Sequence, residues 1–132
     1  MVSDIQKKTL LQTACAVRER AYAPYSNYKV GAAILTGDGQ IFSGVNVENA
    51  SYGLSICAER SAIFTAVAEG VRDIVAVAIC TANLGSPCGA CRQVMVEFAG
   101  DMPVYLTDTK GNVRETSLHN LIPEYFGPGH LT

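Results

Sequence analysis

Apolar residues recur at helical spacing through the first twenty positions of the chain. Ser3 and Gln6 match a capping box, in which a serine and a glutamine three residues later satisfy free backbone groups at a helix start. The pattern therefore predicts an amphipathic helix over residues 4–20. Its apolar positions are Ile5, Leu10, Leu11, Ala14, Val17 and Ala21.

After Pro24 the pattern becomes typical of strands. Residues 29–35 are small or β-branched, and the turn sequence Gly37-Asp38-Gly39 follows them. Residues 41–47 are therefore expected to return as an antiparallel partner. Residues 48–53 form a polar loop that leads to Cys57.

Helical and strand patterns alternate through the middle of the chain. A helix is predicted from Cys57 to a glycine stop at Gly70. Residues 73–80 form a continuous apolar run, which indicates a central strand buried on both faces. A third helix is expected from Cys88, with Val94, Met95 and Phe98 facing inward.

The last third predicts a short hairpin and a brief helix. Residues 103–106 and a segment around Val113 flank the turn at residues 110–112, and so short a connection requires antiparallel pairing. Residues 117–121 should form a short helix, and residues 123–129 an irregular tail. The predicted order is α-β-β-α-β-α-β-β-α, a layered α/β domain with one mixed sheet.

Composition narrows the class of protein. The chain has 132 residues, 48% of them apolar, and a net charge of −2. These values fit a single domain over residues 1–132 and exclude a disordered or acidic solvating protein. The scattered lysines and arginines also argue against a nucleic-acid binder.

The sequence favours a cytoplasmic location. The first four residues lack the basic start and apolar block of a signal peptide, and no apolar run approaches the roughly 20 residues that span a bilayer. In the cytosol, five cysteines are expected to be thiols or metal ligands rather than disulfides. Cys15 and Cys80 fall within apolar patterns. We expect Cys15 to be a core or half-buried residue and Cys80 to lie in the core.

Cys57, Cys88 and Cys91 form the candidate metal site. Cys88 and Cys91 are three residues apart in the first turn of a helix, so they share a face, and Cys57 stands at another helix start. Structural zinc sites usually have four protein ligands, whereas catalytic sites keep one position for water. Neither His119 nor His130 has a ligand-like spacing, so we predict an open, catalytic site with three ligands.

Two charged residues stand two and three positions after Cys57. Three thiolates and one Zn²⁺ carry a net charge of −1, and Arg60 is expected to offset it by donating hydrogen bonds to sulfur. Glu59 is long enough to reach a metal-bound water and to act as a proton shuttle. Their alternative interpretations are a surface arginine and a glutamate that merely favours a helix N-terminus.

These motifs resemble a known family of enzymes. Cys57-Ala58-Glu59 and Pro87-Cys88-Gly89-Ala90-Cys91 resemble the signature of zinc-dependent nucleoside and nucleobase deaminases, with Cys57 in place of the histidine of many members. The resemblance to the small homotetrameric cytidine deaminases extends over residues 5–128. The segments that carry it are residues 24–26, 30–33, 44–50, 57–60 and 86–93.

The resemblance implies a fold, a cofactor and a reaction. The fold would be a three-layer α/β/α sandwich with one mixed five-stranded sheet, and each subunit would bind one Zn²⁺. The reaction would be hydrolytic deamination of cytidine and deoxycytidine in pyrimidine salvage. Zinc-bound hydroxide would attack C4 of the cytosine ring, and Glu59 would carry protons to N3 and to the leaving ammonia.

The resemblance also implies substrate contacts. Asn46 and Glu48, two apart at a strand end, would hold the ribose 3′-hydroxyl, and the backbone of Ala58 and Ser86 would read the base. Tyr28 replaces the phenylalanine that usually stacks near the base, so its hydroxyl needs a partner. The remaining implied contacts come from Tyr52 and Phe126, which would complete the pocket of a neighbouring subunit unless they serve only packing.

Other functions remain as alternatives at this point. A non-catalytic structural zinc module is disfavoured by the three-ligand count. A nucleic-acid deaminase would need a basic channel. A deaminase of a cytosine-containing nucleoside antibiotic, or of free cytosine, would have little use for a ribose-binding pair at Asn46 and Glu48.

Overall fold

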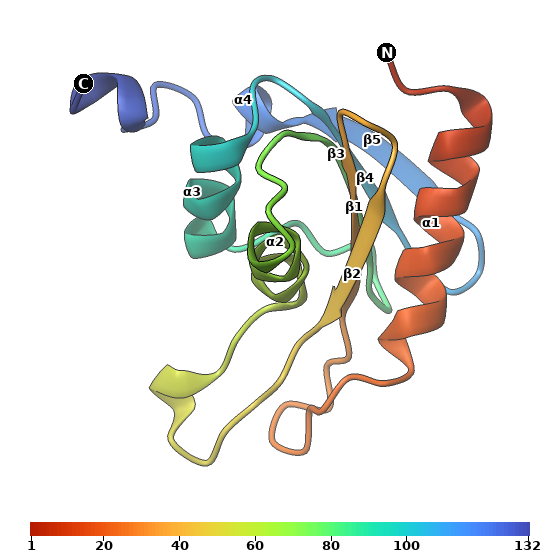
Figure 1. The fold of residues 1–132 in the computed structure, drawn as a ribbon. Coiled ribbons are helices and arrows are strands. Elements are labelled where there is room, and N and C mark those ends of the chain that lie inside the picture. Colours follow the sequence, from red (N-terminus) through yellow and green to blue (C-terminus); the bar gives the residue numbers. More distant parts are fainter.

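A five-stranded mixed sheet with helices on both faces forms the molecule, and the computed structural model describes all residues 1–132 (Figure 1). The helices and strands follow one another in the predicted order. The strands are β1 (Gly31–Thr36), β2 (Ile41–Val45), β3 (Ile74–Cys80), β4 (Pro103–Thr107) and β5 (Val113–Ser117). The helices are α1 (Asp4–Arg18), α2 (Ala58–Ala68), α3 (Gly89–Phe98) and α4 (Leu118–Leu121), with 3₁₀ turns η1 (Tyr52–Leu54) and η2 (Pro128–His130).

The sheet has the order β2-β1-β3-β4-β5. Neighbouring strands are antiparallel except β3 and β4, which run parallel because α3 connects them as a crossover. Both predicted hairpins, β1-β2 and β4-β5, are confirmed. The mixed sheet predicted from the sequence is confirmed with them.

Helices cover the two faces of the sheet unequally. In Figure 1, α1 lies against one face, while α2 and α3 lie on the other. Two apolar clusters correspond to these faces, one around Leu10 and Ala14 of α1 and the other around Ile63 of α2 and Met95 of α3. β3 is buried along nearly its whole length because it lies between the clusters, as its apolar run predicts.

Gly44 sets how closely α2 approaches the sheet. A Cβ atom at Gly44 would lie 2.6 Å from the carbonyl oxygen of Ala58 and 2.8 Å from the Cβ of Ser61. The first turn of α2 therefore rests directly on the backbone of β2. This contact fixes the helix start that carries Cys57 and Glu59.

Some element boundaries differ from the predictions by a few residues. β1 begins at Gly31 rather than residue 29, since the Val30 amide donates to Oδ1 of Asn46 instead of to a strand. α1 ends at Arg18 with turns beyond it, and β2 ends at Val45. Part of the tail predicted as irregular forms η2.

Several helix ends match the sequence pattern closely. The capping box of Ser3 and Gln6 is present, and Gly70 adopts a φ of 85° directly after the cap of α2. Cys57 and Cys88 are N-caps, one residue before their helices begin. None of the helices is both long and apolar enough to cross a membrane.

Candidate active site

The three cysteines predicted as metal ligands meet where two helices begin. Cys57 caps α2, Cys88 caps α3, and Cys91 lies in the first turn of α3. Their Sγ atoms all lie within 4.8 Å of one another. The separation is 3.8 Å between Cys57 and Cys88, and 3.4 Å between Cys88 and Cys91.

This geometry fits a zinc ion. Tetrahedral coordination with Zn–S bonds of about 2.3 Å places sulfurs about 3.8 Å apart, close to the observed separations. Neither histidine takes part, because His119 pairs with Asp101 and His130 bonds to the Gly127 amide. The protein thus supplies three thiol ligands, the number expected of a catalytic zinc site.

The cluster favours a thiolate at Cys57 even before a metal binds. Hydrogen bonding from Cys91, followed by that from Arg60, lowers the pKa of Cys57 to about 5 despite its partial burial. Hydrogen bonding to Cys57, followed by burial and the nearby Glu59 charge, raises the pKa of Cys91. One negative charge is therefore shared by the cluster, and a divalent cation would stabilise the remaining thiolates.

Glu59 is almost completely buried beside the cysteines, with 4% of its surface exposed. Burial raises the pKa of its carboxyl group to about 7, and the nearby Cys57 charge acts in the same direction. A carboxyl group with this pKa exchanges protons readily near neutral pH. It has the properties that the proposed proton shuttle requires.

Arg60 makes the sulfur contact expected from the sequence. Its Nη2 donates to the Cys57 Sγ at 3.3 Å, and this contact raises the pKa of the guanidinium. The Nε of Arg60 is buried without a hydrogen-bond partner. The guanidinium thus brings a positive charge to the cluster at a cost in desolvation, which is consistent with a role in charge compensation.

Asn46 is used mainly to hold the backbone that precedes β1. Its Oδ1 accepts from the Val30 amide and its Nδ2 donates to the Tyr28 carbonyl, both at 2.8 Å. One N–H and one lone pair of this amide remain for another partner. The sequence did not reveal this structural task.

Glu48 is similarly engaged with the loop before β1. One of its oxygens accepts from the amides of Tyr25 and Ser26 at 3.0 and 3.1 Å, and the other accepts from the Ser26 hydroxyl. The Ser26 hydroxyl is the main cause that lowers the pKa of Glu48. Glu48 also lines a cavity of about 330 Å³ together with Tyr25, Ser26, Tyr52 and Ser55.

Tyr28 has the hydroxyl partner that its sequence position required. The Tyr28 hydroxyl donates to Oδ1 of Asn83 at 2.7 Å. Asn83 belongs to the loop between β3 and α3, in which the Gly85 amide donates to Oγ1 of Thr81 at 2.7 Å. The loop that leads to Ser86 and Cys88 is thus tied to the loop that precedes β1.

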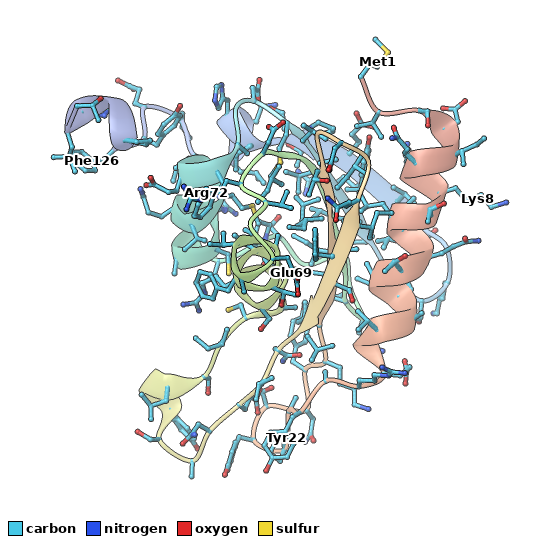
Figure 2. All side chains as sticks on the ribbon, viewed as in Figure 1. Met1, Lys8, Tyr22, Glu69, Arg72 and Phe126 are labelled. Atoms are coloured by element: carbon cyan, nitrogen blue, oxygen red, sulfur yellow. The ribbon has the colours of Figure 1, made fainter.

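Tyr52 and Phe126 lie at the surface, with 74% and 58% of their area exposed. The ring of Tyr52 is near that of Tyr25, whereas Phe126 stacks on His130. Figure 2 shows Phe126 at the edge of the tail, well apart from the loops around Tyr22. The Phe126 carbonyl accepts a 2.7 Å hydrogen bond from Nε2 of Gln93, two residues after Cys91 on α3.

Sequence reasoning assigned no task to Arg92, which has a clear one in the structure. Its Nε donates to the Pro87 carbonyl at 2.8 Å and its Nη1 to the Leu121 carbonyl at 2.6 Å. Arg92 thereby fixes the peptide directly before Cys88. Its place one residue after Cys91 was the available signal.

A second cavity lies away from this chemistry. It has a volume of about 750 Å³ and lies between α3 and the tail, lined by residues such as Phe98, Tyr125 and His130. It contains none of the clustered cysteines. The grouping of thiols and carboxyl, rather than cavity size, locates the candidate active site.

Comparisons with known proteins give similar proteins over most of the chain. Residues 4–107 match the family model described as "Cytidine and deoxycytidylate deaminase zinc-binding region". The chain is 48% identical to a cytidine deaminase of Sporosarcina psychrophila, covering 98% of this chain and 96% of the relative. A cytidine deaminase of Halalkalibacterium halodurans is 47% identical, with 92% of this chain and 95% of the relative covered.

A solved structure is also similar. The crystal structure of cytidine deaminase from Burkholderia pseudomallei superposes with a TM-score of 0.85 at 52% identity. The match covers 90% of this chain and 98% of that one. The likeness therefore includes the sheet, the covering helices and the segments that carry the cysteines.

Proposed function

Because the chain belongs to the cytidine and deoxycytidylate deaminase family, we propose that it hydrolyses cytidine and deoxycytidine to uridine and deoxyuridine, with release of ammonia. The observation that carries the proposal is the grouping of three Sγ atoms within 4.8 Å beside the buried carboxyl of Glu59. This combination unites a metal site with a proton carrier. A purely structural zinc site needs no such carrier.

The zinc ligands in this proposal are Cys57, Cys88 and Cys91. A zinc ion held there would supply a bound water of lowered pKa as the nucleophile. Arg60 offsets the excess negative charge of three thiolates through its contact with Cys57. Arg92 keeps the peptide before Cys88 in place, so the ligands are pre-positioned.

Glu59 carries the protons of the reaction. It takes a proton from the water that adds to C4 of the ring and delivers it to N3. It then moves the proton of the new C4 hydroxyl to the amino group, which departs as ammonia and leaves a carbonyl at C4. The burial of this carboxyl group beside the thiols supports the role.

Substrate orientation is assigned to residues around these groups. The spare hydrogen-bonding capacity of Asn46 and Glu48 would hold the ribose 3′-hydroxyl. The cavity that Glu48 lines supports this assignment. The ring of Tyr28 would stack near the base, and the backbone of Ala58 and Ser86 would contact its polar edge.

We also propose that residues 1–132 act as one catalytic domain in a cytoplasmic homotetramer. Tyr52 and Phe126 are exposed and would complete the pocket of a neighbouring subunit. Gln93 holds the Phe126 backbone through a 2.7 Å hydrogen bond and would present this ring.

A substrate panel tests the proposal. Zinc-loaded protein is incubated with cytidine, deoxycytidine, cytosine or a cytosine-containing oligonucleotide, and deamination is followed by ultraviolet absorbance. The two nucleosides should react, while cytosine and the oligonucleotide should not. Activity only on cytosine or the oligonucleotide would contradict the nucleoside assignment.

A further inference from the structure

Two cysteines outside the metal cluster lie in direct contact. The Sγ of Cys15, on α1, is 2.7 Å from the Sγ of Cys80, the last residue of β3. The two residues are separated by 65 positions in the sequence, so the fold alone brings them together. A disulfide bond has a sulfur separation of roughly 2.0 Å, and the two atoms need to approach by only about 0.7 Å to form one.

The elements that carry the two thiols hold them in register. Cys80 is paired with Gly31 of β1 and with Thr107 of β4, so it is fixed in the middle of the sheet. Next to Cys15 on α1, Ala14 is fully buried and packs closely against Gly31. Random motion therefore does little to separate the sulfurs.

The two thiols differ in their access to solvent. Cys15 is half-buried, whereas Cys80 is completely buried. Burial, followed by hydrogen bonding with Cys15, raises the pKa of Cys80 to about 12. Cys15 is thus the thiol that a small oxidant meets first, and Cys80 is placed to react with the product.

We propose that Cys15 and Cys80 are a reversible oxidation site, at which hydrogen peroxide produces a disulfide that joins α1 to β3. Cys15 sulfur attacks one peroxide oxygen, the O–O bond breaks, and a sulfenic acid and water result. Cys80 sulfur then attacks the Cys15 sulfur. The S–O bond breaks, the hydroxyl group leaves with the Cys80 proton as a second water, and the S–S bond forms.

The disulfide would lie at the start of the loop that leads to Cys88. Thr81 follows Cys80, and its Oγ1 accepts the Gly85 amide in the loop that leads to Cys88. A covalent link to α1 would restrain the base of this loop and the centre of the sheet. Neither thiol is a proposed zinc ligand, so disulfide formation and deamination can succeed or fail separately.

The test is peptide mapping of zinc-loaded protein treated with hydrogen peroxide, since the bound metal protects the other three cysteines. After alkylation and trypsin digestion, Cys15 lies in the peptide of residues 9–18, and Cys80 lies in residues 73–92 with Cys88 and Cys91. We expect a disulfide between Cys15 and Cys80 to join these two peptides, with Cys88 and Cys91 alkylated. Dithiothreitol should restore the separate peptides.

Two variants make the result decisive. Cys15→Ser and Cys80→Ala should each abolish the linked peptides. In wild-type protein, peroxide treatment should also move the urea unfolding midpoint to higher concentration, and this shift should be absent from both variants. Recovery of Cys15 in wild-type protein as a thiol or a sulfinic acid, without the link, would overturn the proposal. A link from Cys15 to Cys88 or Cys91 instead of Cys80 would overturn it as well.

Discussion

Replacing Gly44 with alanine tests whether the close contact between β2 and α2 holds the active site together. The added Cβ would lie 2.6 Å from the Ala58 carbonyl oxygen and also too close to the Ala62 amide nitrogen. An α-helix joins a carbonyl and an amide four residues apart in this way, so the methyl group would intrude on the backbone of the first turn rather than on a flexible side chain. α2 must move outward or its first turn must distort.

Two opposing effects determine the size of the change. Alanine in a strand is intrinsically better than glycine by about 0.5–1 kcal/mol. Overpacking costs about 1–3 kcal/mol when neighbours can adjust, and backbone atoms adjust poorly. We therefore expect a net loss of about 1–2 kcal/mol, which for a chain of this size lowers Tm by about 4–8 °C.

The assay is urea unfolding together with zinc titration. Gly100→Ala is the matched control, because a Cβ there meets no atom within 4 Å. Gly44→Ala should unfold at lower urea concentration and bind zinc more weakly, since Cys57 caps the displaced helix. A Gly44→Ala protein as stable as wild type and with unchanged zinc affinity would refute the argument.

Substitutions at three other positions test separate parts of the site and the fold. Arg60→Gln should weaken zinc binding by about 10- to 100-fold in a chelator competition assay, with Arg60→Lys less affected; equal affinity of the Gln variant would contradict charge compensation at Cys57. Tyr28→Phe, which keeps the ring, should change KM less than about threefold, whereas Tyr28→Ala should raise it at least about fivefold; equal effects would exclude base stacking. Hydrogen bonds, first of all from the Asn112 side chain, lower the pKa of Asp108 in the folded protein. The ionised Asp108 therefore stabilises the fold at pH values above its unfolded-state pKa of about 4, and this stabilisation is lost as pH falls through the lower folded-state pKa. Unfolding measured at pH 7 and pH 3 should show the stability gap between wild type and Asp108→Asn shrinking at pH 3, and a constant gap would contradict this.

The sequence predicted those features that depend on local patterns. Apolar spacing located the elements because β3 is buried along its run and α1 buries Leu10 and Ala14, although Ile5, predicted on the same face, is exposed. Cys88 and Cys91 could be assigned to one ligand group because residues three positions apart on a helix share a face. Glu59 was singled out by its place next to Cys57, and its burial agrees with that choice.

Features that depend on contacts between distant segments could not be predicted. The partner of the Tyr28 hydroxyl, Asn83, is 55 residues away. The dual hydrogen bonding of Asn46 to the segment before β1 depends on how β2 ends. The contact of Cys15 with Cys80 requires the packing of α1 on the sheet, which spacing does not specify.

Glu59→Gln tests the central claim most directly. The amide keeps the size of the side chain and cannot carry the proton, while the three cysteines remain to bind metal. We expect metal analysis to find one zinc ion per chain. We expect kcat on cytidine to fall by about 100- to 10,000-fold. Near-normal turnover by the zinc-loaded variant would contradict the role of Glu59 as the proton carrier.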